Sequence, residues 1–186
     1  DKTEAVPKQS EAQKRQRLRN IYKRVKPLSY SQEVVDYLTI SRLISAETIK
    51  DADNGALGIV KGFEYYAGRD IIGRFDVMSA MVSVLGQPVT YHLTYIKKGE
   101  KADVANPRKV MSPVKTMSGG CVEIFKQAPI MGVAEGVETA LSCYEMFNMP
   151  VWASINSANM GKFTPPEGVE KLYIYADNDS NRVGLK

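Results

Sequence analysis

Apolar residues recur at two different spacings, which divide the chain into a helical start, a strand-rich middle and a last third that alternates strands with a helix. Near the N-terminus, four apolar residues lie at the spacing of one helical face: Leu18, Ile21, Tyr22 and Val25. Pro27 is expected to end this helix. Ser29 with Gln32 is a capping-box signal for a second helix through Leu38, and a short third helix is expected at residues 45–50.

The middle of the chain has the alternation typical of strands, beginning near Ile59. Apolar and aromatic residues alternate on both sides of turn residues 86–88: Val82 and Val84 before them, and Val89, Tyr91, Leu93 and Tyr95 after them. This pattern predicts an antiparallel hairpin. Gly119 and Gly120 then precede residues 121–125, which we expect to form another edge or hairpin strand.

In the last third, strand-like and helical patterns alternate. Residues 130–134 are an apolar run, apolar residues then recur at helical spacing from Val137 to Phe147, and residues 150–155 are apolar again. Strand, helix and strand over so short a distance predict a βαβ unit with parallel strands and a right-handed crossover. Residues 172–176 supply a further buried strand. The fold class we predict is α/β: a mixed α+β N-terminal subdomain followed by a mainly parallel sheet flanked by helices.

Composition is that of an ordinary soluble globular chain, with 44% hydrophobic and 25% charged residues among 186. The apolar runs are too short to span a bilayer, so no membrane association is expected. Two cysteines and one histidine are too few for a disulfide framework or a four-ligand zinc site. No secretory leader opens the chain, so we expect a reducing cytoplasm. Because residue 1 is Asp, we also expect a piece of a longer protein.

Positive charge is concentrated at the N-terminus. Residues 1–26 hold nine Lys and Arg against three acids, which leaves sixteen against eighteen for residues 27–186. This head is therefore predicted to be a basic amphipathic helix. Docking of its apolar stripe on the rest of the protein is favoured over contact with nucleic acid, and a role at a membrane surface is weaker still.

A second basic stretch runs from residue 97 to residue 115. Its two acids, Glu100 and Asp103, are outnumbered by six cations: Lys97, Lys98, Lys101, Arg108, Lys109 and Lys115. Phosphate is the natural partner of such a surface, which makes these six residues candidate nucleic-acid contacts. The alternative is a lysine-rich loop that its charges keep soluble.

Three acidic residues follow predicted strands. Glu135 comes directly after residues 130–134, and Asp177 and Asp179 come after residues 172–176. If the two strands are parallel neighbours, their carboxyl ends bring the three carboxylates together. Such groups repel one another unless a cation lies between them, and hard oxygen ligands suit Mg²⁺ or Mn²⁺ and chemistry on phosphates. Taken singly, each motif is as well explained by a turn or a helix cap.

Three other residues are expected to have structural roles. Glu138, one helical turn beyond Glu135, is interpreted as a solvated or capping residue. His92 lies in a hairpin that alternates with tyrosines and is interpreted as structural. Trp152 lies in an apolar strand and is expected in the core.

The segment from Gly132 to Gly184 resembles a TOPRIM domain, the catalytic module shared by bacterial-type primases, topoisomerases and some nucleases. Three motifs carry this likeness: Glu-Gly-Val-Glu-Thr-Ala-Leu from Glu135, Val-Trp-Ala-Ser from Val151, and Ala-Asp-Asn-Asp from Ala176. The amino-acid sequences of these motifs are similar to those in the primase part of phage and plasmid primase-helicase proteins. Upstream features extend the resemblance to about residues 30–184: Tyr37-Leu38 with Arg42, His92-Leu93-Thr94-Tyr95, Lys101-Ala102 and Gly119-Gly120.

The resemblance implies DNA-templated synthesis of short RNA primers by metal-dependent nucleotidyl transfer during phage or plasmid replication. Glu135 would be the general acid or base, or a neighbour of the metal, and Asp177 and Asp179 would bind Mg²⁺ or Mn²⁺. It also implies single-stranded DNA template and nucleoside triphosphates as substrates, and a replicative helicase as partner. Its expected parts are a basic head (1–27), a template-binding subdomain (28–128) and a catalytic TOPRIM domain (129–186).

The sequence departs from that family at both ends. No cysteine and histidine set could build the zinc ribbon with which such primases begin, so we expect it before Asp1. A TOPRIM domain also needs a further helix and strand after its Asp-x-Asp motif, so residues 129–186 are expected to be a truncated domain. Two other functions stay open: a metal-dependent nuclease, and a non-catalytic nucleic-acid-binding fragment that recruits a helicase.

Overall fold

Short helices come before the first strand. The computed structural model describes residues 9–177. The first helical elements are α1 (Glu11–Tyr22), η1 (Leu28–Tyr30), α2 (Gln32–Asp36), the π-helical turn η2 (Tyr37–Ser41) and α3 (Ala46–Ala52). A capping box starts α1, because the Ser10 hydroxyl accepts from the Gln13 amide and the Gln13 side chain accepts from the Ser10 amide.

The predicted cap of the second helix was wrong. Ser29 lies inside η1, and it is the Ser31 hydroxyl that accepts the Val34 amide at the start of α2. Pro27, at φ −49°, leads directly into the 3₁₀ turn, so the helix begins two residues later than the capping-box pattern indicated.

An antiparallel sheet forms the middle of the molecule, and it confirms the predicted hairpin. Its strands are β1 (Leu57–Ala67), β2 (Asp70–Val84), β3 (Gln87–Lys97), β4 (Glu100–Lys101) and β5 (Arg108–Val110), and β4 and β5 both pair with β3. The turn between β2 and β3 consists of Leu85 and Gly86, both at positive φ, and Gln87 already pairs with Val84. A two-residue turn of this kind matches the twist of antiparallel strands.

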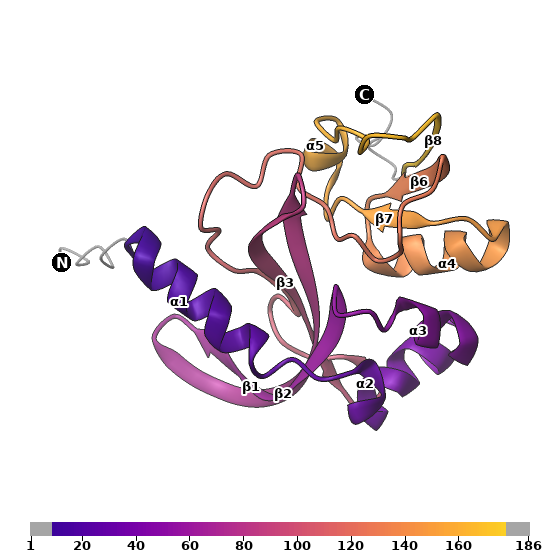
Figure 1. The fold of residues 1–186 in the computed structure, drawn as a ribbon. Coiled ribbons are helices and arrows are strands. Elements are labelled where there is room, and N and C mark those ends of the chain that lie inside the picture. Colours follow the sequence, from indigo (N-terminus) through magenta and orange to yellow (C-terminus); the bar gives the residue numbers. More distant parts are fainter. Residues whose placement is uncertain (1–8, 178–186) are drawn as a thin grey trace.

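The last third forms a parallel sheet, as its strand–helix–strand pattern predicted. Its elements are β6 (Ile130–Ala134), α4 (Val137–Phe147), β7 (Val151–Ala153), α5 (Ser157–Met160) and β8 (Lys171–Tyr175). The strand order is β7-β6-β8, and both pairings are parallel. No residue of β8 is buried, so the prediction that this strand is buried was wrong. The two sheets together make a mixed α and β fold (Figure 1).

Residues 121–125 connect the two sheets. They form isolated bridges, Ser83 with Cys121 and Val122 with Ala153, instead of the edge or hairpin strand that we expected. Adjacent residues of an extended chain direct their backbone groups to opposite sides, so one short segment can bond to both sheets. The Trp152 indole donates to the Phe125 carbonyl at 2.7 Å and is buried, which confirms its place in the core.

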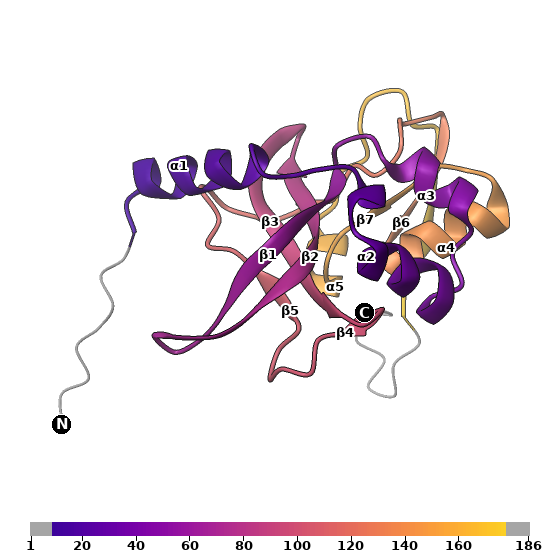
Figure 2. The same ribbon diagram turned by 90° about the horizontal axis from the view of Figure 1, so that it is seen from below.

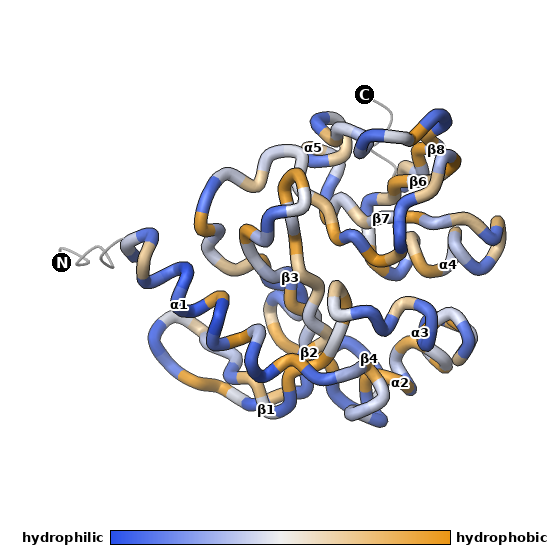
Figure 3. Tube along the Cα trace, viewed as in Figure 1, coloured by the Kyte–Doolittle hydropathy of each residue, from blue (hydrophilic) through white to orange (hydrophobic). Residues whose placement is uncertain are grey.

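Each face of the antiparallel sheet packs against different elements. Alternation along β3 sends Tyr91, Leu93 and Tyr95 to the face covered by α1, and Ile96 to the face that packs on α2, α3 and the parallel sheet. Hydrophobic residues accordingly recur at intervals along the strands and along α1 (Figure 3). Helix α1 lies at the opposite end of the molecule from α3 and α4 (Figure 2). Leu18 and Ile21 of α1, and Val25 just after it, pack on the sheet as the favoured interpretation of the basic head predicted, while Tyr22 of the predicted stripe is exposed.

No helix in residues 9–177 combines the length and the apolar character needed to cross a membrane.

Candidate active site

Two of the three predicted carboxylates follow neighbouring strands of the parallel sheet. In the register of β6 and β8, Ala134 lies opposite Tyr175, so Glu135 and Asp177 extend from the same edge of the sheet. Glu135 is half-buried and Asp177 is exposed. Burial raises the pKa of the Cys143 thiol on α4, and the charge of Asp177 raises it further, so Asp177 lies within electrostatic reach of this helix. Asp179 lies outside the described residues.

The donors at this edge have the chemistry of a magnesium site. Carboxylate oxygens are the ligands that Mg²⁺ takes in proteins, and Asp177 would hold it here with Glu135 beside it. No group of three His, Cys, Asp or Glu side chains that could hold a metal ion occurs among residues 9–177. The third ligand that the sequence predicts, Asp179, is beyond that range.

Glu138 lies in the first turn of α4, where a capping residue was predicted, but it is not solvated: it bonds to a distant part of the chain. The Tyr37 hydroxyl donates to its Oε1 at 2.6 Å, across 101 positions of sequence. Burial by itself would raise the pKa of Glu138, but the hydrogen bonds from Tyr37 and from its own backbone amide, with the charges of Lys101 and Arg108, hold this pKa below its usual value. Glu138 is therefore an ionised carboxylate in the first turn of α4, where the helix dipole also favours it.

Three basic side chains from the antiparallel half gather near this carboxylate, and we call Arg42, Lys101 and Arg108 the cationic cluster. The Arg42 guanidinium lies 5.0 Å from the centre of the Tyr37 ring. Burial lowers the pKa of Lys101, and the charges of Arg108 and Arg42 lower it further while Glu138 opposes them. Glu138, the carboxylate on which Lys101 and Arg108 act, follows Glu135 by three residues.

The six cations predicted to contact nucleic acid are divided between the two faces of the antiparallel sheet. Consecutive residues of a strand point to opposite sides, so Arg108 lies near α4 while Lys109 lies over the Tyr65 ring on the α1 side. Lys97 lies 5.9 Å from the Phe75 ring centre, and Lys98 is exposed in the turn after β3. Arg15 lowers the pKa of Glu11, and the charge of Lys115 acts in the same direction, so Lys115 lies on the α1 side. Only Lys101 and Arg108 of the six belong to the cationic cluster.

His92 is a neutral, buried residue beside the cationic cluster. It is 9% exposed, and its Nδ1 and the Thr94 hydroxyl have no hydrogen-bond partner among the described residues. Burial lowers the pKa of His92 to about 4; Arg108 and Lys101 act in the same direction and Glu138 opposes them. His92 is therefore an uncharged side chain within electrostatic reach of Glu138, Arg108 and Lys101.

The buried His92 makes stability fall as the solution becomes acidic. Between its ordinary pKa of 6.5 and its folded value of about 4, the unfolded chain binds the proton and the folded chain does not. We therefore expect the free energy of unfolding to fall by about 2 kcal/mol from pH 7 to pH 5. Urea unfolding at both pH values measures this difference in the free energy of unfolding.

His92→Gln, which removes the single histidine, should make the free energy of unfolding depend less on pH. An unchanged pH dependence in that variant would contradict the assignment of the effect to His92. Glu138 titrates below this window because its pKa is lowered.

Comparison with known proteins agrees with this geometry. The family model of the Toprim domain matches residues 130–186. A Toprim domain indicates a metal-dependent enzyme that acts on nucleic acids, of the primase, topoisomerase or nuclease type. Toprim domains generally bind Mg²⁺. Searches of curated proteins and of solved structures found no match. A second family model, the domain of unknown function DUF7146, matches residues 12–122. Since that match covers more than half of the chain, the protein belongs to the DUF7146 family and carries a Toprim domain after it.

Proposed function

We propose that this protein synthesises short RNA primers on a single-stranded DNA template. The observation that carries the proposal is the pairing of β6 with β8, which puts Glu135 and Asp177 at one edge of the parallel sheet, while Lys101 and Arg108 act on Glu138, three residues beyond Glu135. Carboxylates for a divalent metal and cations for a triphosphate are the two requirements of nucleotidyl transfer. A hydrolytic site needs the metal but binds no triphosphate.

In the proposed reaction, the primer 3′ oxygen attacks the α-phosphorus of the incoming triphosphate. A new phosphorus–oxygen bond forms, the bond to the β-phosphate breaks, and pyrophosphate leaves. When bound, Mg²⁺ or Mn²⁺ would neutralise charge on the phosphates. Glu135 would accept the proton of the attacking hydroxyl, and Asp177 and Asp179 would hold the metal. Lys101 and Arg108 would stabilise charge on the leaving pyrophosphate, with Arg42 next to them.

The same proposal names the partners. The template is single-stranded DNA, the other substrates are nucleoside triphosphates, and a replicative helicase would deliver the template in the cytoplasm of a bacterial cell or an infected host. Lys97, Lys98, Lys109 and Lys115 remain candidate contacts to the strand outside the reacting centre.

Primer synthesis by the wild-type chain tests the proposal. The assay uses a single-stranded DNA template, labelled nucleoside triphosphates, and Mg²⁺ or Mn²⁺. We expect short labelled products that need the template, all the triphosphates and the metal. Metal-dependent loss of template without triphosphates would replace primer synthesis with nuclease activity. Intact template, no product and normal strand binding would favour a non-catalytic module.

A further inference from the structure

A groove of about 900 Å³ lies between α1 and the outer face of the antiparallel sheet. Its floor is formed by buried Leu93 and Tyr95 of β3, and its walls come from α1, β1, β2 and β5. The cationic cluster and α4 lie on the other face of the sheet, so this groove is separate from the candidate active site.

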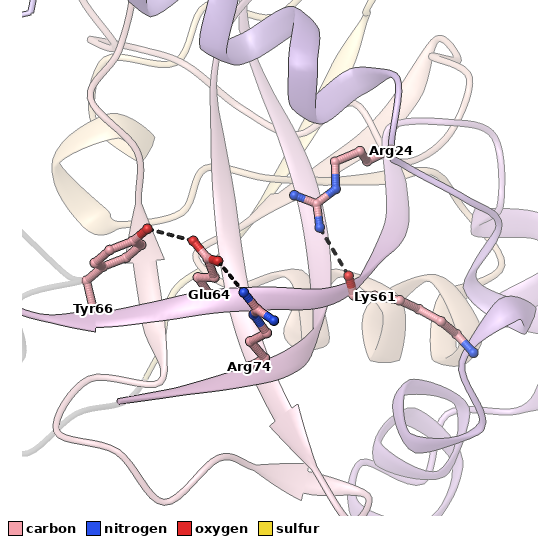
Figure 4. A network of polar contacts seen from close by, with 5 residues as sticks. All are labelled: Arg24, Lys61, Glu64, Tyr66 and Arg74. Carbon is pink, nitrogen blue, oxygen red and sulfur yellow. Dashed lines mark hydrogen bonds and ion pairs between the residues drawn. The ribbon is translucent and has the colours of Figure 1, made fainter. Parts of the chain in front are cut away.

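The groove is strongly basic. Its lining holds four cations, Arg17, Arg24, Arg74 and Lys109, and one carboxylate, Glu64. The Glu64 carboxylate already has two donors: it accepts hydrogen bonds from the Tyr66 hydroxyl at 2.6 Å and from Arg74 at 2.9 Å (Figure 4). In the part of the chain that the structure describes, the other three cations have no ion-pair partner within 4.0 Å.

Two of these cations are nevertheless held in defined positions by neutral groups. The Arg24 guanidinium donates to the Lys61 carbonyl at 3.2 Å (Figure 4). It also lies 5.3 Å from the Phe63 ring centre. The Lys109 ammonium donates to the Tyr66 carbonyl at 2.9 Å and lies 3.5 Å from the Tyr65 ring centre. Carbonyl and ring contacts orient the charges without neutralising them, so the groove retains its attraction for anions.

Aromatic surface is interleaved with these charges. Tyr66 is 44% exposed and Phe63 is half-buried, and both line the groove. Cations spaced along a groove with accessible aromatic rings are the arrangement that binds the phosphates and stacks the bases of a single strand. An acidic peptide would satisfy the charges but would leave the rings without a stacking partner.

We propose that this groove binds single-stranded nucleic acid, with phosphates at Arg17, Arg24 and Lys109 and a base on Tyr66. The inference rests on the proposed function for its ligand, since the proposed template is single-stranded DNA and Lys109 is a candidate contact to it. It adds where the strand binds: at a site that needs neither metal nor nucleotide and involves neither Glu135 nor Asp177. It also assigns a role to the cations of α1, whose apolar stripe is used for docking.

The test is the binding of a fluorescent oligo(dT) of about 20 nucleotides to the full chain in EDTA, followed by anisotropy at several salt concentrations. The paired change Arg17→Gln with Lys109→Gln should weaken binding about tenfold and reduce the salt slope by about 1.4, since each lost phosphate contact accounts for about 0.7 on a single strand. Tyr66→Ala should weaken binding about fivefold or more.

Matched control variants distinguish oligonucleotide binding in the groove from attraction by positive charge elsewhere on the surface. Arg19→Gln with Lys23→Gln removes the same charge from exposed positions in or directly after α1 that do not line the groove, and Tyr30→Ala removes an exposed ring elsewhere. Both should bind within about twofold of wild type. Equal weakening by the control pair would overturn the inference, as would competition by poly-glutamate as effective as that by unlabelled oligonucleotide at equal charge.

Primer synthesis and strand binding in the groove are tested by separate measurements, so one proposal can be rejected without the other. Asp177→Asn should bind the oligonucleotide normally, because Asp177 is not part of the groove. If no primer is ever made but binding depends on Arg17, Lys109 and Tyr66, the proposed reaction is wrong and the groove stands. Normal binding by the groove variants would reject the groove alone.

Discussion

Asp177→Asn and Glu135→Gln are each expected to lower primer synthesis by about a hundredfold or more. Both changes keep the size of the side chain and remove one negative charge from the edge shared by β6 and β8. The metal would then be bound more weakly, and Glu135→Gln would also remove the proton acceptor. Loss of a single group that stabilises charge at a reacting centre typically costs about 10²–10³ in rate. Labelled product per unit time, measured over a range of Mg²⁺ concentrations, gives the effect.

A matched change elsewhere on the same sheet is the control. Glu170→Gln removes a carboxylate from an exposed position just before β8 and should leave the rate within about twofold of wild type. Oligonucleotide binding in EDTA should be unchanged in all three variants. Full activity in Asp177→Asn and Glu135→Gln would exclude these carboxylates from the reaction.

Leu141→Ala is expected to lower the free energy of unfolding by about 2–5 kcal/mol. Leu141 on α4 is 0% exposed and belongs to the core cluster that joins residues of both sheets with α2 and α3. Its truncation removes buried apolar contacts and leaves a cavity that the surrounding side chains fill only in part. Urea unfolding followed by Trp152 fluorescence and by far-ultraviolet circular dichroism measures the loss.

Met146→Ala on the same helix is the control, since Met146 is 71% exposed. It should change stability by less than about 0.5 kcal/mol. The fluorescence and dichroism transitions should coincide, because Trp152 reports on the parallel sheet while dichroism reports on the whole chain, and the two halves share one core. Separate transitions would show that the halves unfold independently, which this core does not predict.

Local patterns predicted most of the elements. The period of the apolar residues identified α1, the hairpin of β2 and β3, and the unit of β6, α4 and β7, because amphipathic periodicity depends on neighbours in the sequence. Local rules failed where the backbone departed from the predicted element. The capping-box pattern placed the cap at Ser29, but a 3₁₀ turn after Pro27 includes Ser29 and the cap is Ser31. Residues 121–125 have strand-like composition, yet they bond to two different sheets.

The order of strand, carboxylate and helix can be read from the sequence, and it predicts that Glu135 and Asp177 follow neighbouring parallel strands at one edge, as the register of β6 and β8 has them. The distant groups around Glu138 could not be predicted in this way. The bond from Tyr37 to Glu138, the cationic cluster, and the division of Arg108 from Lys109 depend on how the two sheets pack. Contacts across 101 residues leave no periodic trace in a single sequence, since packing, charge and burial act between surfaces that meet only after the chain has folded.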